Sequence, residues 1–567
     1  MNRSVETLLN RRFDVVVVGG GIYGACLAWE ASSHGLSVAL VDKGDFGWAT
    51  SANMHRILHG GFRYLRNADV KRIRESVRER NVMMRLAPHL TDPMPFLVPT
   101  YERGIQHREV MRVALKLYDM LSYGRNRGIE DASRQIPPGR IISREECLRL
   151  APGLDPRGVT GGAIWYDGAL RDPVRLILEL IRTAAEAGAC AANYVEVTGF
   201  LRNGASVAGV NAVDLMTGDD FQIQASVVVS AAGPWNDRLL AKLGQDAPRE
   251  PTRHVRSVDV VTRALTLENH GLALMGPQHK APSRTIRYFI APWRELSVVG
   301  SVDYLESTDP DDFRTQASEL EYLIRVVRSC MPGSGLGVDD IICVQAGLIP
   351  HAGREPLRDP YNAARHYCIV DHGKLHGVGG LVSIMGIKYT TARDIAEKTI
   401  DLILRKLAKP PLASRTAAAP LHGGSMESFD DLLSHAITSA PHGLSATVME
   451  QLVRSYGSGY KEVLAHVGEA SRWAEPIAPS SAVIKAQIVH AVHREMAVRL
   501  SDVVLRRTGL GTLAHPGSVA LRACADLMAG FLGWNEKRIE NEIVETNAHL
   551  ERFWARPAAD GQSQSQL

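Results

Sequence analysis

The chain has 567 residues, of which 45% are hydrophobic and 22% charged, and its formal net charge is +3. This length is sufficient for about two to four globular domains, and the nearly balanced charge supplies no large field for nucleic acid, which we exclude as a partner. The polar segment before the first apolar run is unlike a signal peptide. Because no apolar run approaches the ~18 residues that cross a bilayer, we expect a cytoplasmic protein.

The cysteines indicate a reducing environment. Seven are scattered along the chain, and no two form a Cys-x-x-Cys pair. Most lie among apolar neighbours, so we expect buried free thiols rather than disulfides, and no metal site.

The first strongly patterned segment predicts a dinucleotide-binding strand–turn–helix–strand unit. Residues 14–18 are an aspartate and four valines, typical of a strand buried on both faces. In the spacing that follows, Gly19 permits a tight turn, Gly21 lets backbone N–H groups approach a pyrophosphate, and Gly24 lets helix and strand pack closely. Asp42 ends the next strand and can accept a hydrogen bond from a ribose hydroxyl. A glycine turn in an unrelated α/β sheet is the alternative interpretation.

A basic helix is predicted over residues 68–86. Its arginines and lysine greatly outnumber its two glutamates, so its outer face is either simply solvated or in contact with anionic lipid. Further on, an apolar strand at residues 226–230 ends in a glycine turn, which suggests a return to the dinucleotide-binding sheet. Residues 251–350 are mostly strand-like, and beyond residue 424 the periodicity is helical to about residue 553.

These patterns divide the chain into six segments. Parts of the cofactor-binding domain are expected at 12–90, 161–250 and 351–408. A helical insert with part of the substrate domain is expected at 91–160, an antiparallel substrate domain at 251–350 and a C-terminal helical domain at 425–555.

Several motifs, in order along the chain, closely resemble the FAD-dependent glycerol-3-phosphate dehydrogenases and oxidases. They occupy residues 50–65, 87–90, 232–235, 292–303, 386–391 and 495–508. The resemblance covers roughly residues 12 to 555. It implies an α/β fold with a glutathione-reductase-like, FAD-binding Rossmann domain, an antiparallel β substrate domain and a C-terminal α-helical cap domain.

The resemblance implies FAD as cofactor and specifies the positions that would hold it. The glycine motif would hold the pyrophosphate, Asp42 the ribose, and Val197 the adenine through its backbone. The other positions in the list below would line the flavin. A helix N-terminus or a lysine near the flavin stabilises the negative charge of its reduced form. The positions are Gly19, Gly21, Gly24, Asp42, Thr50, Ser51, His59, Gly60, Gly61, Val197, Gly233, Trp235, Gly386, Lys388 and Thr390.

The chemistry implied by the resemblance is oxidation of a secondary alcohol beside a phosphate, with hydride passing to the flavin. Such a reaction needs a base for the hydroxyl proton and cations for the phosphate. The candidate catalytic and substrate residues are His59, Arg63, Lys388, Arg365 and Asp259. For His59, a structural loop histidine is the alternative.

Four departures from the family pattern lie in motifs around the flavin and substrate. Ile349 stands where the family has a substrate arginine, and Asp259 where it usually has a histidine. Residues 54–56 (Met-His-Arg) replace a small residue, a hydroxyl residue and a lysine, and Ile387 replaces a glycine. Losing one charge-assisted contact costs on the order of 2 kcal/mol. Arg354 or His351 could supply the missing cation.

Three functional hypotheses follow. The first is a glycerol-3-phosphate dehydrogenase that passes electrons to a quinone, with contact to the inner face of the cytoplasmic membrane and a homodimeric assembly as further expectations. The second is the same fold and chemistry on a different hydroxy or amino substrate. The third is a flavin-binding protein without turnover. Because an inserted segment typical of the family's oxidases is not seen in the cap region, quinone is preferred over oxygen as acceptor.

Overall fold

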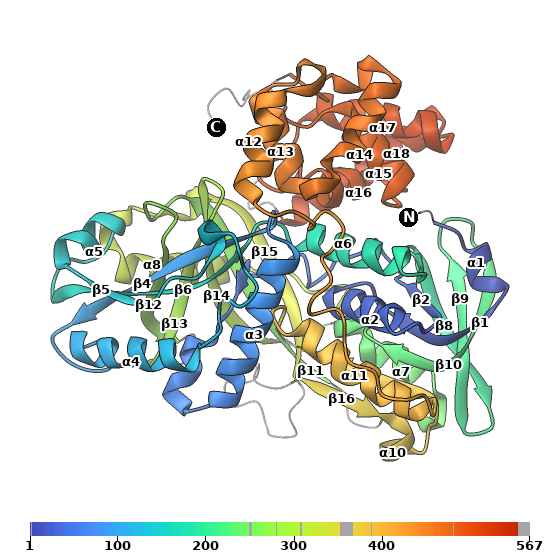
Figure 1. Ribbon diagram of the computed structural model, residues 1–567, viewed down its shortest axis with the longest axis horizontal. Coiled ribbons are helices and arrows are strands. Elements are labelled where there is room, and N and C mark those ends of the chain that lie inside the picture. The colour runs from blue at the N-terminus through green and yellow to red at the C-terminus, as the bar shows by residue number, and fades with distance from the viewer. Residues whose placement is uncertain are drawn as a thin grey trace.

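The computed structural model describes residues 1, 3–248, 252–278, 281–306, 309–351, 367–386, 388–479 and 481–553. Two β-sheets lie side by side in this part of the chain, and a group of C-terminal helices covers one end of them (Figure 1). The cysteines are free thiols, four of them buried, as the sequence predicts.

The first sheet has the parallel core expected of a dinucleotide-binding domain. Its main path is β16 (Cys368–Asp371), β17 (Leu381–Met385), β10 (Asp220–Ser230), β1 (Arg12–Val18), β2 (Val38–Val41) and β7 (Cys190–Ala192), with β8 (Val195–Asn203) and β9 (Ser206–Asp214) joined through β10. Strand β1 pairs in parallel with β10 and with β2. Its four valines are buried because both faces of the sheet are covered.

Three helices cover one face of this sheet: α2 (Ile22–Ser33), α6 (Pro173–Glu186) and α11 (Ala392–Lys406). Their apolar residues share a single core cluster with β1 and β2. Helix α6 begins at Pro173, since the Asp172 carboxylate accepts hydrogen bonds from the N–H groups of Val174 and Arg175 and Pro173 occupies the first turn.

The second sheet is mainly antiparallel and has nine strands. In order they are β15 (Ile341–His351), β11 (Arg253–Arg263), β14 (Leu296–Glu306), β13 (Ala281–Trp293), β12 (Gly271–Gln278), β4 (Thr91–Tyr101), β6 (Val159–Leu170) and β3 (Ile57–Leu58), with β5 (Arg140–Ile142) paired to β6. Helix α8 (Ala317–Cys330) packs on this sheet. The sequence analysis assigned residues 251–350 to strands and did not predict this helix.

Strand β6 requires a correction to the predicted segments. It begins at Val159 and pairs with β4 over its whole length, so residues 161–170 belong to the second sheet and not to the cofactor-binding segment 161–250. A strand pattern does not identify the sheet that the strand joins. We therefore propose Leu170 as the boundary.

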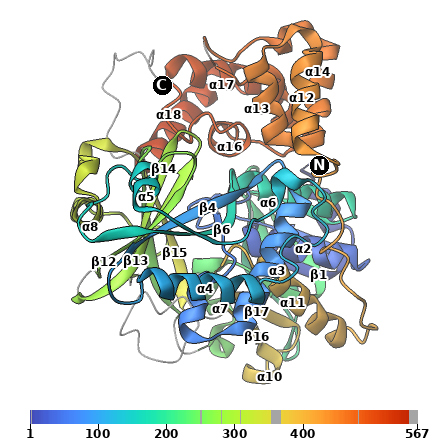
Figure 2. The same ribbon diagram turned by 60° about the vertical axis from the view of Figure 1, so that its left-hand side comes forward.

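The C-terminal helices form two core clusters of their own and stand above the sheets (Figures 1 and 2). They are α12 (Phe429–Ser439), α13 (Ala446–Tyr456), α14 (Tyr460–Glu469), α15 (Lys485–Arg494), α16 (Leu500–Asp502), α17 (Ser518–Leu532) and α18 (Glu536–Phe553). The remaining helices of the described residues are α1 (Glu6–Leu9), α3 (Val70–Leu86), α4 (Arg108–Leu121), α5 (Arg144–Leu150), α7 (Asn236–Ala241) and α10 (His372–His376). In the described ranges, no helix combines the length and apolarity needed to cross a membrane.

Candidate active site

A cavity of about 710 Å³ lies between the two sheets. This volume is within the range of roughly 300–1,000 Å³ found for small-molecule and cofactor sites. The carboxyl ends of β1, β2 and β10 line one side, and β11, β13 and β15 of the second sheet line the other. Expected cofactor positions such as Gly21 and Asp42 and expected substrate positions such as Arg63 and Asp259 therefore face one continuous space.

The glycine turn between β1 and α2 fits a pyrophosphate. Gly19 has φ +109°, and a Cβ there would lie 2.5 Å from the Ala231 carbonyl oxygen. A Cβ on Gly24 would lie 1.7 Å from the carbonyl oxygen of Gly19, so Gly24 packs the helix against the turn and does not line the cavity. Gly21 does line it, at the N-terminus of α2. Backbone N–H groups and the helix dipole favour an anion at this position.

The end of β2 carries the acid predicted for a ribose. Asp42 lines the cavity, and its carboxylate accepts hydrogen bonds from the N–H groups of Gly20 (2.6 Å) and Gly44 (2.8 Å) and from the Trp48 indole (3.1 Å). Burial raises the pKa of Asp42 to about 6, although these hydrogen bonds favour the ionised carboxylate and act to lower the pKa. A carboxylate has about four acceptor positions, so a hydroxyl can still bind.

Two tryptophans flank this end of the cavity. The rings of Trp48 and Trp235 lie 5.1 Å apart, and Lys43 Nζ lies 4.4 Å from the Trp235 ring. Val197 and Glu196 line the same cavity. Aromatic faces and a cation next to the acid suit an adenosine group.

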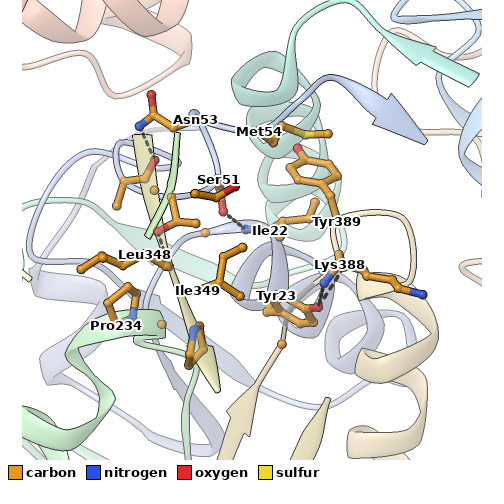
Figure 3. A pocket seen from close by; sticks show the side chains of 18 of the residues that line it. Ile22, Tyr23, Ser51, Asn53, Met54, Pro234, Leu348, Ile349, Lys388 and Tyr389 are labelled. Atoms are coloured by element: carbon orange, nitrogen blue, oxygen red, sulfur yellow. Dashed lines mark hydrogen bonds between the residues drawn. The ribbon is translucent and has the colours of Figure 1, made fainter. Parts of the chain in front are cut away.

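The loop between β2 and β3 is tied to the second sheet. The Thr50 hydroxyl donates to the Leu348 carbonyl (2.9 Å). Ser51 Oγ accepts from the Ile22 N–H (3.1 Å), as Figure 3 shows. Next along the chain, the Gly60 N–H donates to Asp167 Oδ1 (2.5 Å). Gly60 itself lies behind the cavity, where a Cβ would approach Arg80 and Tyr118 within 2.2 Å.

A second glycine position brings the last predicted flavin loop against α2. A Cβ on Gly386 would lie 1.8 Å from the Tyr23 ring, and the Tyr23 hydroxyl donates to the Lys388 carbonyl (2.8 Å) (Figure 3). Thr390 Oγ1 accepts from the His59 N–H (3.0 Å). The loop at 386–390 and the loop at 50–61 therefore close over the same part of the cavity.

Positive charge gathers beside this loop. Lys388 Nζ lies 4.2 Å from the centre of the Tyr64 ring, and Arg63 lies 5.3 Å from it. Burial alone would raise the pKa of Tyr64, but Arg63 and Lys388 outweigh burial and lower it. Burial lowers the pKa of Lys388, and Tyr64 opposes that shift. We call Arg63, Tyr64 and Lys388 the cationic corner.

Two histidine–aspartate pairs face the cavity. His55 Nδ1 lies 3.0 Å from Asp259 Oδ1, and His59 Nδ1 lies 3.4 Å from Asp167 Oδ2. Both imidazoles contact the Phe289 ring, with centroids 6.3 Å and 5.9 Å away.

The structure brings most of the predicted site residues to the cavity. Those that line it are Gly19, Gly21, Asp42, Thr50, Ser51, His59, Gly61, Arg63, Val197, Gly233, Trp235, Asp259, Gly386, Lys388 and Thr390. Gly24 and Gly60 support the lining from behind. Arg365, Arg354, Ile387 and the side chain of His351 lie outside the described residues. Ile349, where the sequence resemblance implies an arginine, does line the cavity (Figure 3).

Sequence reasoning missed other lining residues, namely Tyr23, Trp48, His55, Asp167, Arg287 and Phe289. A period-two pattern on β13 could have found the last two, because Tyr288 between them is buried in the core on the opposite face. Nothing local in the sequence marks Trp48 or Asp167.

Comparison with known proteins bears on the whole length of the chain. Residues 14–393 match the FAD dependent oxidoreductase family, and residues 414–539 match the C-terminal domain of alpha-glycerophosphate oxidase. A glycerol-3-phosphate dehydrogenase of Mycobacterium leprae is 31% identical over 96% of this chain and 89% of its own length. One from Synechocystis is 29% identical over 97% and 98%.

The fold has a counterpart among solved structures. A glycerol-3-phosphate dehydrogenase from Bacillus halodurans, complexed with FAD, superimposes with a TM-score of 0.76 at 24% identity and covers 98% of each chain. The glycine cradle, the α2 N-terminus and the acid at the end of β2 fit that cofactor. The chain therefore belongs to the FAD-dependent oxidoreductase family, as an enzyme of the glycerol-3-phosphate dehydrogenase type that uses FAD.

Proposed function

We propose that the protein oxidises the secondary alcohol of sn-glycerol 3-phosphate to dihydroxyacetone phosphate and delivers the electrons to a quinone. The relatives that match nearly the full chain carry this substrate in their names. The observation that carries the proposal is the cationic corner, which places two cations and a phenol in the cavity that also holds the FAD cradle.

Each part of the cavity has a distinct task in this proposal. Arg63 and Lys388 hold the phosphate dianion, since two cations beside one hydroxyl donor suit its charge. When bound, FAD supplies the hydride acceptor. Phe289 and the walls around it keep water from the reacting carbon, and His55 and His59 are the bases available for the hydroxyl proton.

A second candidate is the same chemistry on another hydroxy or amino substrate. Ile349 favours it, because an aliphatic side chain lines the cavity at the position where the resemblance implies a substrate arginine. An isoleucine cannot make a bidentate contact with phosphate. A substrate that carries a smaller or less charged group in place of the phosphate would not need a bidentate contact.

The deciding experiment is anaerobic reduction of the bound flavin, followed by its absorbance, with a panel of phosphorylated and unphosphorylated polyols and amines. Bleaching by glycerol 3-phosphate, and a large increase in its KM in Arg63→Ala, would support the first candidate. Bleaching by another member of the panel alone would favour the second. A flavin that no member reduces would leave a binding protein.

A quinone is dissolved in the membrane, so we propose in addition that α4 contacts the membrane surface. For the basic helix predicted at 68–86, contact with anionic lipid was one of the two interpretations of its outer face. In the structure, Arg80 of α3 is fully buried, Arg78 is paired with Asp394, and Arg85 bonds to the Ala417 carbonyl. These three basic residues of α3 are therefore engaged within the protein, whereas Lys71 and Arg74 are exposed.

Helix α4 lies along the outside of the second sheet (Figure 2). Its exposed large apolar residues are spaced three or four apart and form one stripe: Val110, Val113, Leu117 and Met120. Arg108 and Lys116 are exposed on the same helix. An apolar stripe flanked by cations suits the surface of an anionic bilayer.

A further inference from the structure

His55 and Asp259, both departures from the family pattern, form a hydrogen-bonded pair in the cavity. Their ring nitrogen and carboxylate oxygen are 3.0 Å apart across 204 residues of sequence. The side chains are 13% and 4% exposed. The His55 imidazole, on the loop before β3, is therefore oriented by the Asp259 carboxylate on β11.

Strand β11 is shaped to present Asp259. Val258 and Val260 are buried in the core on one face of the sheet, so Asp259 between them faces the cavity. The register of β11 against β14 shifts between these two valines, an irregularity that re-aims a side chain. On β14, a Cβ at Gly300 would lie 2.0 Å from Asp259 Oδ1. The absence of a side chain at Gly300 therefore makes room for the carboxylate.

The hydrogen bond orients the ring of His55. When Nδ1–H donates to the carboxylate, Nε2 is the nitrogen that can accept a proton. Nε2 is buried and has no hydrogen-bond partner among the described residues. A buried acceptor left unpaired is unfavourable, and a hydroxyl group of a bound substrate would supply the missing partner.

The pair at His59 is built differently. Its carboxylate, Asp167, also binds Arg80 (3.0 Å) and the Gly60 N–H (2.5 Å), so its charge is shared with groups that hold the loop. The His59 contact is longer, at 3.4 Å, and its side chain is 43% exposed. For Asp259, the hydrogen bond present in the described part of the chain is the one to His55.

Building on the proposed alcohol oxidation, we propose that His55, oriented by Asp259, is the general base. The substrate O–H bond breaks and its proton moves to His55 Nε2, while the O–H electron pair becomes the second bond of the carbonyl. The C–H bond breaks and its hydrogen leaves with both electrons to the oxidised flavin. Asp259 then faces a positively charged imidazolium, which it stabilises.

The test compares His55→Asn, Asp259→Asn and His59→Asn, with His435→Asn on the exposed face of α12 as the matched control. The rate constant of anaerobic flavin reduction is measured against pH, with the alcohol that reduces the wild-type flavin. His55→Asn should lower it about 10²- to 10⁴-fold, the usual contribution of a general base. Asp259→Asn should lower it less and shift the acid limb of the pH profile. Asp259 on β11 and His59 on the loop interact with His55, and Arg287 on β13 lines the same cavity; these groups can also shape this limb.

Three further readouts separate a base from a structural residue. The FAD content of His55→Asn, from its absorbance, should equal that of His435→Asn. Imidazole added to His55→Ala should restore part of the rate. In the ¹⁵N-histidine spectrum of the wild-type holoenzyme, the His55 signal, identified by its loss in His55→Asn, should show the Nδ1-protonated tautomer.

The outcomes discriminate between the two proposals. If glycerol 3-phosphate reduces the wild-type flavin but His55→Asn keeps its rate and pH profile, or if only His59→Asn abolishes reduction, the base assignment is overturned and the proposed function stands. If another alcohol reduces it, that substrate replaces glycerol 3-phosphate and the same comparison applies. If no alcohol reduces it, both proposals fall.

Discussion

Arg507 of the C-terminal domain makes two hydrogen bonds, of 2.6 and 2.8 Å, to the carboxylate of Asp45 in the cofactor-binding domain. Both side chains are fully buried, and Arg506 adds a third contact to Asp45 at 2.6 Å. Asp45 lies three residues after Asp42, on the loop whose later residues line the cavity. The C-terminal domain therefore anchors a wall of the cofactor site.

Asp45→Asn should be strongly destabilising. Removing one partner of a buried pair typically costs about 3–5 kcal/mol because the other charge is left unpaired. The free energy of unfolding, measured with denaturant, should fall by this order and the FAD content with it. The control is Glu536→Gln, which breaks an exposed pair with Arg522 and should cost no more than about 1 kcal/mol. Equal effects of the two variants would contradict the anchoring role.

Gly24→Ala should prevent FAD from binding. The new Cβ would lie 1.7 Å from the Gly19 carbonyl oxygen, so α2 must move away from the turn that faces the pyrophosphate. The flavin-to-protein absorbance ratio of the purified variant measures the effect. Gly468→Ala in α14 is the control, because a Cβ at this position would have no neighbouring atom within 4 Å. A Gly24→Ala protein with full flavin content would show that the turn is not the cradle.

Stability should fall as the pH drops below about 6.5, in part through His490. Burial lowers the pKa of His490 to about 3 and the charge of Arg182 adds to the shift, while Glu495 opposes it. Between pH 6.5 and 3 the unfolded chain binds the proton and the native state does not. The native state therefore loses stability on acidification, by at most about 2 kcal/mol at pH 5. The free energy of unfolding, measured with denaturant at about pH 6.5 and pH 5, should fall less in His490→Gln than in the wild type. An equal fall in both proteins would assign the effect to other groups.

Met120→Glu and Val113→Glu should weaken binding to vesicles of anionic lipid. These residues are 66% and 67% exposed on the α4 stripe, and burying such a side chain contributes about 1.5–3 kcal/mol. Co-sedimentation should therefore show a loss of roughly tenfold or more in affinity. Val544→Glu on α18, also 67% exposed, serves as control. Wild-type protein that does not sediment with the vesicles would rule out α4 as a membrane contact.

The sequence predicted the parts of the fold whose signals are local. The four valines of β1 and the glycine spacing at the start of α2 are such signals, because each depends on neighbouring residues alone. The sheet to which β6 belongs depends on its pairing with β4, about sixty residues earlier. The His55–Asp259 pair escaped prediction for the same reason. Each residue alone was only a departure from a motif, and the fold brings the two together.

The order of strands in the first sheet has a consequence for synthesis on the ribosome. Strand β1 lies between β2 and β10, and β10 in turn needs β17, which ends at Met385. Until residues 220–230 emerge, the nascent β1 has an open edge, and until residues 381–385 emerge, β10 has one. An unpaired apolar strand is prone to association with other chains. Trigger factor-like holdases that shield nascent chains should therefore raise the yield of folded protein, and ribosome pausing before residue 381 should lower it.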